Sequence, residues 1–115
     1  MMILDDIING LGISKIIGNL NINIEGITLD SRKVQKKFLF VAIEGSTKDG
    51  HQFINQAIEK GAIAIVHTKD VEFIPNITYI KAKENSQAVA ALLAHNFYNK
   101  QIGRAHVWTP VTASY

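Results

Sequence analysis

The sequence lacks cysteine altogether and has only two prolines among its 115 residues. The absence of cysteine excludes disulfides and thiolate metal sites, which fits a reducing compartment. Also missing is any apolar run close to the roughly 20 residues that a membrane-spanning helix needs. Near the start, Asp5 and Asp6 stand where an export signal would carry basic residues. We therefore expect a cytoplasmic protein with no membrane partner.

A strong charge of one sign is missing too. Charged residues make up 19% of the chain and the formal net charge is +2, so the sequence does not build the positive field of a typical nucleic-acid-binding protein. Lys33, Lys36 and Lys37 form a short basic run without interleaved aromatic residues, a pattern more typical of a solvated edge. We expect no nucleic-acid partner.

Hydrophobic residues make up 47% of the chain, enough for one compact core at this length. The spacing of apolar residues predicts helices over Leu4 to Leu11, over Phe53 to Ile58, and through Val89 and Phe97 after a cap at Asn85 or Ser86. It predicts strands over Ile22 to Leu29 (as one strand or two short ones), Phe38 to Ile43, Ala62 to Val66 and Ile77 to Ile80.

The run from Phe38 to Ile43 is continuously apolar, as expected for the centre of a sheet that is buried on both faces. A helix then leads to the strand from Ala62 to Val66, with Gly61 as the helix stop. This βαβ unit implies parallel pairing and a right-handed crossover. The predicted fold class is α/β, with helices packed on a small mixed sheet that contains the βαβ unit.

The last segment, residues 102–115, differs from the rest of the chain. It shows neither helical nor strand periodicity and contains no acidic residue. Residues 102–112 also match a forward translation of a common sequencing adapter whose stop codon is read as Trp108. Segments of non-native origin are set apart from the fold. We therefore expect one domain over residues 1–101 and a non-native tail over residues 102–115.

Small polar residues follow directly after the strand that ends near Leu29. In α/β sheets, ligands bind beyond the carboxyl ends of strands. There Ser31 can hydrogen-bond a ligand, and the planar guanidinium of Arg32 suits a phosphate or a carboxylate. In the competing interpretation, Asp30 and Ser31 satisfy the backbone of a turn while Arg32 is a surface ion-pair partner. Taken alone, this cluster favours the turn.

A second polar cluster, from Gly45 to His51, follows the next strand. Its glycines permit a tight backbone, and Lys48 can neutralise a phosphate near a helix amino terminus. The cluster lacks the spacing of a nucleotide-triphosphatase phosphate loop, so it forms no ATP site. An ordinary connection with Asp49 as helix cap remains open. Because the histidines lack metal-ligand spacing, we expect no metal site.

Four short sequence motifs occur in order along the chain, and together they resemble those of a known protein family. They are Leu29-Asp30-Ser31-Arg32 within residues 26–34, Leu39-Phe40-Val41-Ala42 within residues 39–45, Asp49-Gly50-His51-Gln52-Phe53-Ile54, and Ala57 with Gly61-Ala62-Ile63-Ala64-Ile65-Val66. In this order and spacing they resemble the first domain of the Mur ligases, over Leu4 to Lys100. One departure is Lys36-Lys37-Phe38, where the family usually has Pro-Gly-Asp. It should alter the turn into the following strand and leave the polar loops intact.

The first two motifs are more similar to the MurE branch of the family than to the MurF branch. The resemblance implies a ligase of peptidoglycan precursor synthesis that depends on ATP and Mg²⁺. Such an enzyme joins a diamino acid, meso-diaminopimelate in preference to L-lysine, to UDP-N-acetylmuramoyl-L-alanyl-D-glutamate. Two alternatives remain open: a MurF-type ligase that adds D-alanyl-D-alanine, and a non-catalytic interaction module in which both polar loops are only turns.

The resemblance also assigns residues to the substrate. It implies that Leu29 and Ser31 contact the uracil nucleotide, and that Ser46, Thr47 and Lys48 form a second contact with the uridine diphosphate. The family's ATP loop, magnesium ligands, and central and carboxy-terminal domains would lie beyond Lys100. We therefore expect this chain to bind the UDP end of the substrate, to bind neither ATP nor Mg²⁺, to contain no catalytic residue and to be inactive alone.

Overall fold

The computed structural model describes residues 2–44, 49–83 and 87–105 of the chain. Its helices are α1 (Leu4–Ile7), α2 (Ile54–Lys60) and α3 (Gln87–Ala105), and its 3-10 turns are η1 (Ser31–Lys33) and η2 (Gly50–Phe53). Its strands are β1 (Met2–Ile3), β2 (Ile13–Ile17), β3 (Asn23–Ile24), β4 (Gly26–Thr28), β5 (Phe38–Val41), β6 (Ala62–His67) and β7 (Thr78–Ala82).

Five of these strands form one mixed sheet in the order β2-β7-β6-β5-β4. The pairs β4–β5, β5–β6 and β6–β7 are parallel, whereas β2 pairs with β7 in the antiparallel sense. β1 and β3 form a separate two-stranded antiparallel sheet. The parallel pair β5–β6, joined through α2, confirms the predicted βαβ unit, and the α/β fold class with a small mixed sheet is confirmed with it.

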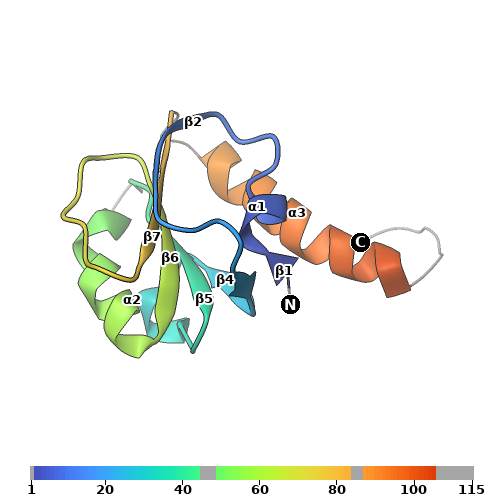
Figure 1. Cartoon of the computed structure of the whole chain (residues 1–115), viewed down its shortest axis with the longest axis horizontal. Coiled ribbons are helices and arrows are strands. Elements are labelled where there is room, and N and C mark those ends of the chain that lie inside the picture. The colour runs from blue at the N-terminus through green and yellow to red at the C-terminus, as the bar shows by residue number, and fades with distance from the viewer. Residues whose placement is uncertain (1, 45–48, 84–86, 106–115) are drawn as a thin grey trace.

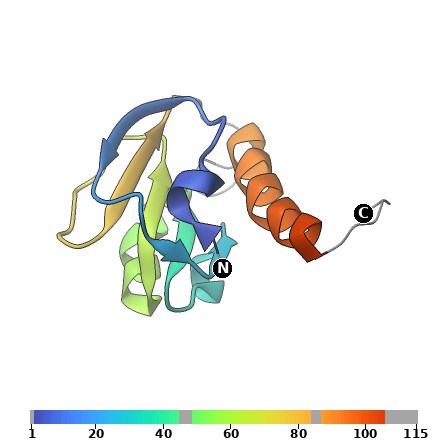
Figure 2. The same cartoon turned by 45° about the vertical axis from the view of Figure 1, so that its right-hand side comes forward.

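The five-stranded sheet lies between two helical layers, with α2 on one face and α1 and α3 on the other (Figure 1 and Figure 2). Successive residues of β5 and the residue after it point to opposite faces. Leu39 and Val41 join the core beneath α3, while Phe40 and Ala42 join the core beneath α2. Their exposed fractions are all 1% or less. The run is continuously apolar because both faces of this strand are covered.

The prediction that Phe38 to Ile43 forms the centre of the sheet is wrong. β6 is the middle strand, and β5 lies beside it, between β6 and β4. A continuous apolar run indicates that both faces of a strand are covered, a condition that several strands of one sheet can meet. The order of the strands depends on pairing between distant segments, about which this local pattern says nothing.

The segment from Ile22 to Leu29 forms two short strands, one of the two predicted arrangements. The break falls at Glu25, whose N–H donates to the carbonyl of Lys37 at 2.9 Å, and not at Gly26, which begins β4. The sequence pattern also missed β2. This strand has three exposed residues in its middle, as an edge strand can, so it lacks the alternation that would have indicated it.

The turn into β5 contains the departure at Lys36-Lys37-Phe38. Lys37 has a φ of 64°, a left-handed conformation that glycine adopts most easily. Its N–H donates to the carbonyl of Gly61 at 2.9 Å. Gly61 ends α2 with a φ of 124°, which confirms the predicted helix stop. The departure therefore lies at the amino ends of β5 and β6, away from the polar loops.

The last described helix, α3, buries Val89, Leu93 and Phe97 at helical spacing in the core that it shares with α1. It runs to Ala105, so residues 102–105 of the expected tail continue this helix, and the non-native origin of residues 102–115 stays a prediction. A helix that has begun adds further residues at little cost even where the apolar pattern stops. Residues 106–115 and the predicted caps Asn85 and Ser86 lie outside the described residues.

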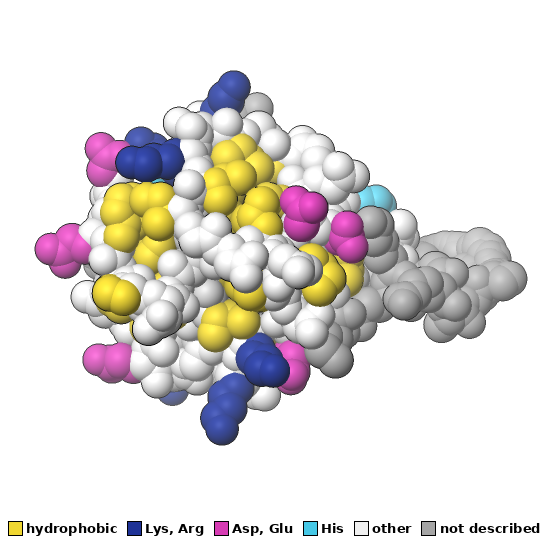
Figure 3. All heavy atoms as spheres, viewed as in Figure 1, with side chains coloured by type: hydrophobic (Ala, Val, Ile, Leu, Met, Phe, Trp, Pro, Cys, Tyr) yellow, Lys and Arg dark blue, Asp and Glu magenta, His cyan; other side chains and the backbone are white. Residues whose placement is uncertain are grey.

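Acidic and basic side chains are interspersed among several small apolar patches on the face of the molecule shown in Figure 3. Among the helices that the structure describes, none combines the length and the hydropathy needed to cross a membrane. The fold is a layered α/β domain. Its polar loops lie beyond the carboxyl ends of β4 and β5, where α/β sheets bind ligands.

Candidate functional site

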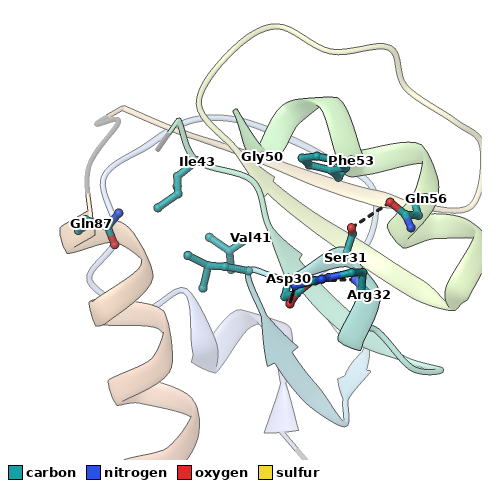
Figure 4. Close-up of a pocket in the computed structure, with 10 residues that line it drawn as sticks. Asp30, Ser31, Arg32, Val41, Ile43, Gly50, Phe53, Gln56 and Gln87 are labelled. Carbon is teal, nitrogen blue, oxygen red and sulfur yellow. Dashed lines mark hydrogen bonds and ion pairs between the residues drawn. The ribbon is translucent and has the colours of Figure 1, made fainter. Parts of the chain in front are cut away.

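A cleft of about 410 Å³ opens beyond the carboxyl ends of β4 and β5 (Figure 4). The residues that line it are Leu29, Asp30, Ser31, Arg32, Val41, Ile43, Gly50, Phe53, Gln56 and Gln87. The buried residues Val41 and Ile43 supply apolar surface, and Gln87 at the start of α3 lies across from Ser31. The volume is within the usual range for small-molecule sites. The position is the edge at which α/β sheets bind ligands.

The structure brings Leu29 and Ser31, two of the residues predicted from the sequence, into this cleft. Leu29 is 45% exposed, so its apolar side chain is available to a ligand. Ser31 is only 6% exposed, and its hydroxyl donates to Oε1 of Gln56 at 3.0 Å. Gln56 comes from α2, so the loop after β4 is tied to a distant helix and is more than a local turn.

Asp30 and Arg32 form a bidentate ion pair on the rim of the cleft. Arg32 Nε lies 3.0 Å from Asp30 Oδ1, and one terminal nitrogen lies 2.9 Å from Oδ2. Asp30 also caps η1 by accepting the backbone N–H of Arg32. The hydrogen bonds from Arg32 lower the pKa of Asp30 to about 2, and the hydrogen bonds to Asp30 raise the pKa of Arg32. For these two residues the structure supports the interpretation as helix cap and surface ion pair.

The second polar cluster is described only at its ends. Ser46, Thr47 and Lys48 lie outside the described residues, so their predicted contact with a ligand stays a prediction. On either side of them, Glu44 and Asp49 form an antiparallel bridge, and the N–H of Gly50 donates to the carbonyl of Ile43 at 2.9 Å. Asp49 caps η2 by accepting the N–H of His51, which confirms the predicted cap.

Sequence reasoning missed the cleft residues that lie outside the two polar clusters. Val41, Ile43 and Phe53 read as core residues in the pattern, and nothing local indicates that they also face a cleft. Gln56 and Gln87 are exposed polar residues on helices. A link between Gln56 and Ser31 could have come only from the predicted packing of α2 over the loop after β4, because 25 residues separate them.

The chemical character of the cleft is mixed. Its apolar surface can stack against a flat ring, while the Ser31 hydroxyl and the amides of Gln56 and Gln87 can hydrogen-bond polar groups around that ring. Within the described ranges there is no group of three or more His, Cys, Asp or Glu residues placed to hold a metal ion. The arrangement suits binding of an organic ligand.

The fold and the cleft define the class of protein: an α/β domain with a ligand-sized cleft at the carboxyl ends of its parallel strands. Residues 23–103 match the sequence model of the Mur ligase family, catalytic domain. The chain belongs to the Mur ligase family.

Curated relatives agree with this assignment. The UDP-N-acetylmuramoyl-L-alanyl-D-glutamate–2,6-diaminopimelate ligase of Clostridioides difficile is 48% identical over 98 residues, which cover 85% of this chain and 20% of that protein. The first such ligase of Clostridium acetobutylicum is 46% identical with the same coverage. The chain thus spans about a fifth of the length of these relatives.

Solved structures show the same fold. The MurF ligase of Thermotoga maritima in complex with ADP is 28% identical, with a TM-score of 0.50 over 59% of this chain and 16% of that one. A MurF structure from Acinetobacter baumannii has a TM-score of 0.56 over 67% of this chain and 16% of that one. Its sequence identity is 19%, so it supports the fold alone.

Proposed function

We propose that this chain is the part of a UDP-N-acetylmuramoyl-L-alanyl-D-glutamate–diaminopimelate ligase that binds the uridine diphosphate end of the substrate. The observation that carries the proposal is the meeting of Leu29 and Ser31 in one cleft at the sheet edge. The resemblance assigns these two residues to the uracil nucleotide. The exposed apolar surface of Leu29 would pack against the base, and Ser31 would hydrogen-bond the nucleotide.

The MurE activity is favoured over the MurF activity because curated relatives with 46–48% identity are diaminopimelate ligases. The MurF structures match at 19–28% identity. The same relatives favour meso-diaminopimelate over L-lysine as the amino acid that the longer enzyme adds in peptidoglycan precursor synthesis. The cysteine-free sequence fits our assignment of this activity to the cytoplasm.

Ser46, Thr47 and Lys48 complete the proposed site on the strength of their position in the sequence. They lie between Glu44 and Asp49, at the carboxyl end of the neighbouring strand. A lysine and two hydroxyls there would meet the diphosphate. Anchoring a long substrate far from its reacting carboxylate helps the enzyme to position that carboxylate, because remote binding energy supports orientation at the reacting centre.

The residues of this chain do not fit the ATP and Mg²⁺ on which the family depends. The sequence has no phosphate loop of the Gly-x-x-x-x-Gly-Lys-Ser/Thr type, and the described part of the chain holds no cluster of metal-ligating side chains. We therefore assign ATP hydrolysis and amide-bond formation to central and carboxy-terminal domains of a longer protein. The 115-residue chain would bind substrate without turning it over.

Titration of the 115-residue chain with UDP by calorimetry tests the proposal. Ser31→Ala should weaken UDP binding by about 1 kcal/mol, or roughly fivefold, because one hydrogen bond is lost. His95→Ala, on an exposed position of α3, is the control and should bind as the wild type does. A wild-type chain that is folded and shows no UDP binding would contradict the proposal and favour the interaction module.

A further inference from the structure

Three charged or titratable side chains from two distant loops meet behind the cleft. Asp49 Oδ1 lies 2.6 Å from His51 Nδ1, and Asp49 Oδ2 accepts a bond of 2.5 Å from Lys69 Nζ. The His51 side chain is 9% exposed and that of Asp49 is 21% exposed. Lys69 follows β6, so the cluster joins the segment after β5 to the segment after β6.

The hydrogen bonds of His51 determine which ring nitrogen carries the proton. Nε2 faces two backbone donors, the N–H of Thr68 at 3.0 Å and the N–H of Lys69 at 3.1 Å. A nitrogen that accepts hydrogen bonds cannot itself carry a proton, so the ring is the neutral Nδ1–H tautomer. Its Nδ1–H then donates to the Asp49 carboxylate. Lys69 and His51 hold the pKa of Asp49 well below its ordinary value, which keeps this acceptor charged.

This cluster is connected to the cleft through η2. Gly50 and Phe53, at the two ends of η2, line the cleft, and His51 lies between them. The segment from Gly50 to Phe53, called here the η2 wall of the cleft, also makes a backbone contact with the residue after β5. The N–H of Gly50 donates to the Ile43 carbonyl, and a Cβ on Gly50 would lie 3.0 Å from that oxygen. The wall thus has little room to move toward β5 and is held on its outer side by His51.

We propose that His51 is a positioning residue. It fixes the η2 wall of the cleft to the segment that follows β6 and thereby determines the shape of the uridine-nucleotide site. The inference rests on the proposed function. His51 does not line the cleft and acts through its neighbours. It holds Gly50 and Phe53 where the ligand meets them. Its Nε2 is the essential atom because it accepts the N–H groups of Thr68 and Lys69.

Two substitutions separate the acceptor role from the donor role of the ring. In His51→Gln, the side-chain carbonyl can reach the position of Nε2 and accept the two backbone N–H groups. In His51→Asn, the amide can still donate to Asp49, but the side chain is too short to reach Thr68 and Lys69. His95→Asn changes a histidine on an exposed face of α3 and serves as the matched control.

We expect His51→Asn to weaken UDP binding by about tenfold, because both backbone bonds to Nε2 that position the wall are lost. His51→Gln should stay within about threefold of the wild type. Hydrogen exchange gives a second readout without ligand: the Gly50 amide should lose protection in His51→Asn and keep it in His51→Gln. Nitrogen-15 NMR of the wild-type ring should show Nδ1 protonated and Nε2 unprotonated. Thermal unfolding identifies the temperatures at which all variants are folded.

The possible failures are distinguishable. Wild-type binding with His51→Asn unchanged in both UDP affinity and Gly50 protection overturns the inference alone, as does a protonated Nε2 in the wild type. A folded wild type that binds no UDP defeats the proposed function, and the inference falls with it. If His51→Asn does not fold, His51→Gln carries the test, because it keeps an acceptor for the Thr68 and Lys69 N–H groups while it loses the bond to Asp49. A tenfold or larger loss of UDP binding by a folded His51→Gln would then overturn the inference.

Discussion

The amino and carboxyl ends of the parallel strands are held by different kinds of contact. At the amino ends the contacts are between backbone groups: the Lys37 N–H bonds the Gly61 carbonyl, and the Glu25 N–H bonds the Lys37 carbonyl. A Cβ added to Gly61 would lie 2.7 Å from Cα of Lys36. This end therefore depends on backbone conformation more than on side-chain chemistry.

At the carboxyl ends, contacts between side chains are added to backbone contacts such as the bond from the Gly50 N–H to the Ile43 carbonyl. Ser31 bonds Gln56, Asp30 bonds Arg32, and Asp49 bonds His51. Such contacts require particular side chains. Three of the four sequence motifs that resemble the Mur ligases reach this end of the sheet. The departure at residues 36–38 lies at the other end. We therefore expect substitutions at the amino ends to affect stability more than ligand binding, and substitutions in the cleft at the carboxyl ends to affect ligand binding more than stability.

The largest effect is expected for Gly61→Ala. The new Cβ would meet the Lys36 backbone while forcing alanine into a φ of 124°, so the free energy of unfolding should fall by about 3 kcal/mol or more. Urea unfolding followed by circular dichroism measures the change. Glu59→Ala, at an exposed position of the same helix, should stay within about 0.5 kcal/mol of the wild type. An Ala variant with wild-type stability would break the comparison at the amino ends.

A second effect, at the carboxyl ends, comes from His67. Its side chain is 1% exposed, and burial lowers its pKa below the ordinary value of 6.5, with a smaller contribution from the charge of Lys81. The unfolded chain therefore binds a proton more readily than the folded chain. Stability should be full above pH 6.5 and be lost as the pH falls through that value toward the folded-state pKa.

The measurement is the melting temperature between pH 7.5 and 5 for the wild type and for His67→Asn. Because the remaining histidines are common to both chains, the difference in slope reports His67 alone. The wild type should lose more stability on acidification than the variant does. Parallel slopes would show that the buried ring does not make this end of the sheet sensitive to acid.

The sequence predicted the fold where a local pattern carries the information. The apolar runs of β5 and β6, the helical face of α2 and the stop at Gly61 all depend on neighbours within a few residues, and each is confirmed. The middle position of β6 and the existence of β2 depend on pairing with distant strands. Those two features could not be read from the chain alone.

The candidate site divides in the same way. Leu29 and Ser31 were assigned to a ligand through the resemblance, because the polar residues after this strand, taken alone, favoured a turn. The Ser31–Gln56 bond and the His51 contacts with Thr68 and Lys69 join residues 17 to 25 positions apart. Their geometry depends on how α2 and the loop after β6 pack, which the sequence pattern does not specify.

A smaller effect of opposite sign is expected for Lys37→Gly. Lys37 is exposed and has a φ of 64°, a conformation in which a Cβ is strained, and glycine removes that strain. Glycine also makes the unfolded chain more flexible, which offsets part of the gain, so the net stabilisation should be at most about 1 kcal/mol. Urea unfolding measures it, and UDP affinity should not change. A destabilised variant would show that the Lys37 side chain contributes more than its backbone.

The smallest effect is expected for Arg32→Gln, and it sharpens the comparison from within the cleft. Arg32 already donates to Asp30 through Nε and one terminal nitrogen, and the low pKa of Asp30, about 2, keeps that carboxylate ionised throughout any ordinary assay. The Arg32 side chain is 80% exposed, so solvent screens its ion pair with Asp30 and the pair contributes little to stability. The variant should melt with the wild type, and its affinity for UDP should change by less than about twofold. Calorimetric titration at low and high salt measures both the affinity and its ionic component. A loss as large as that of Ser31→Ala, present at low salt and reduced at high salt, would mean that Arg32 exchanges its partner on binding and belongs to the site.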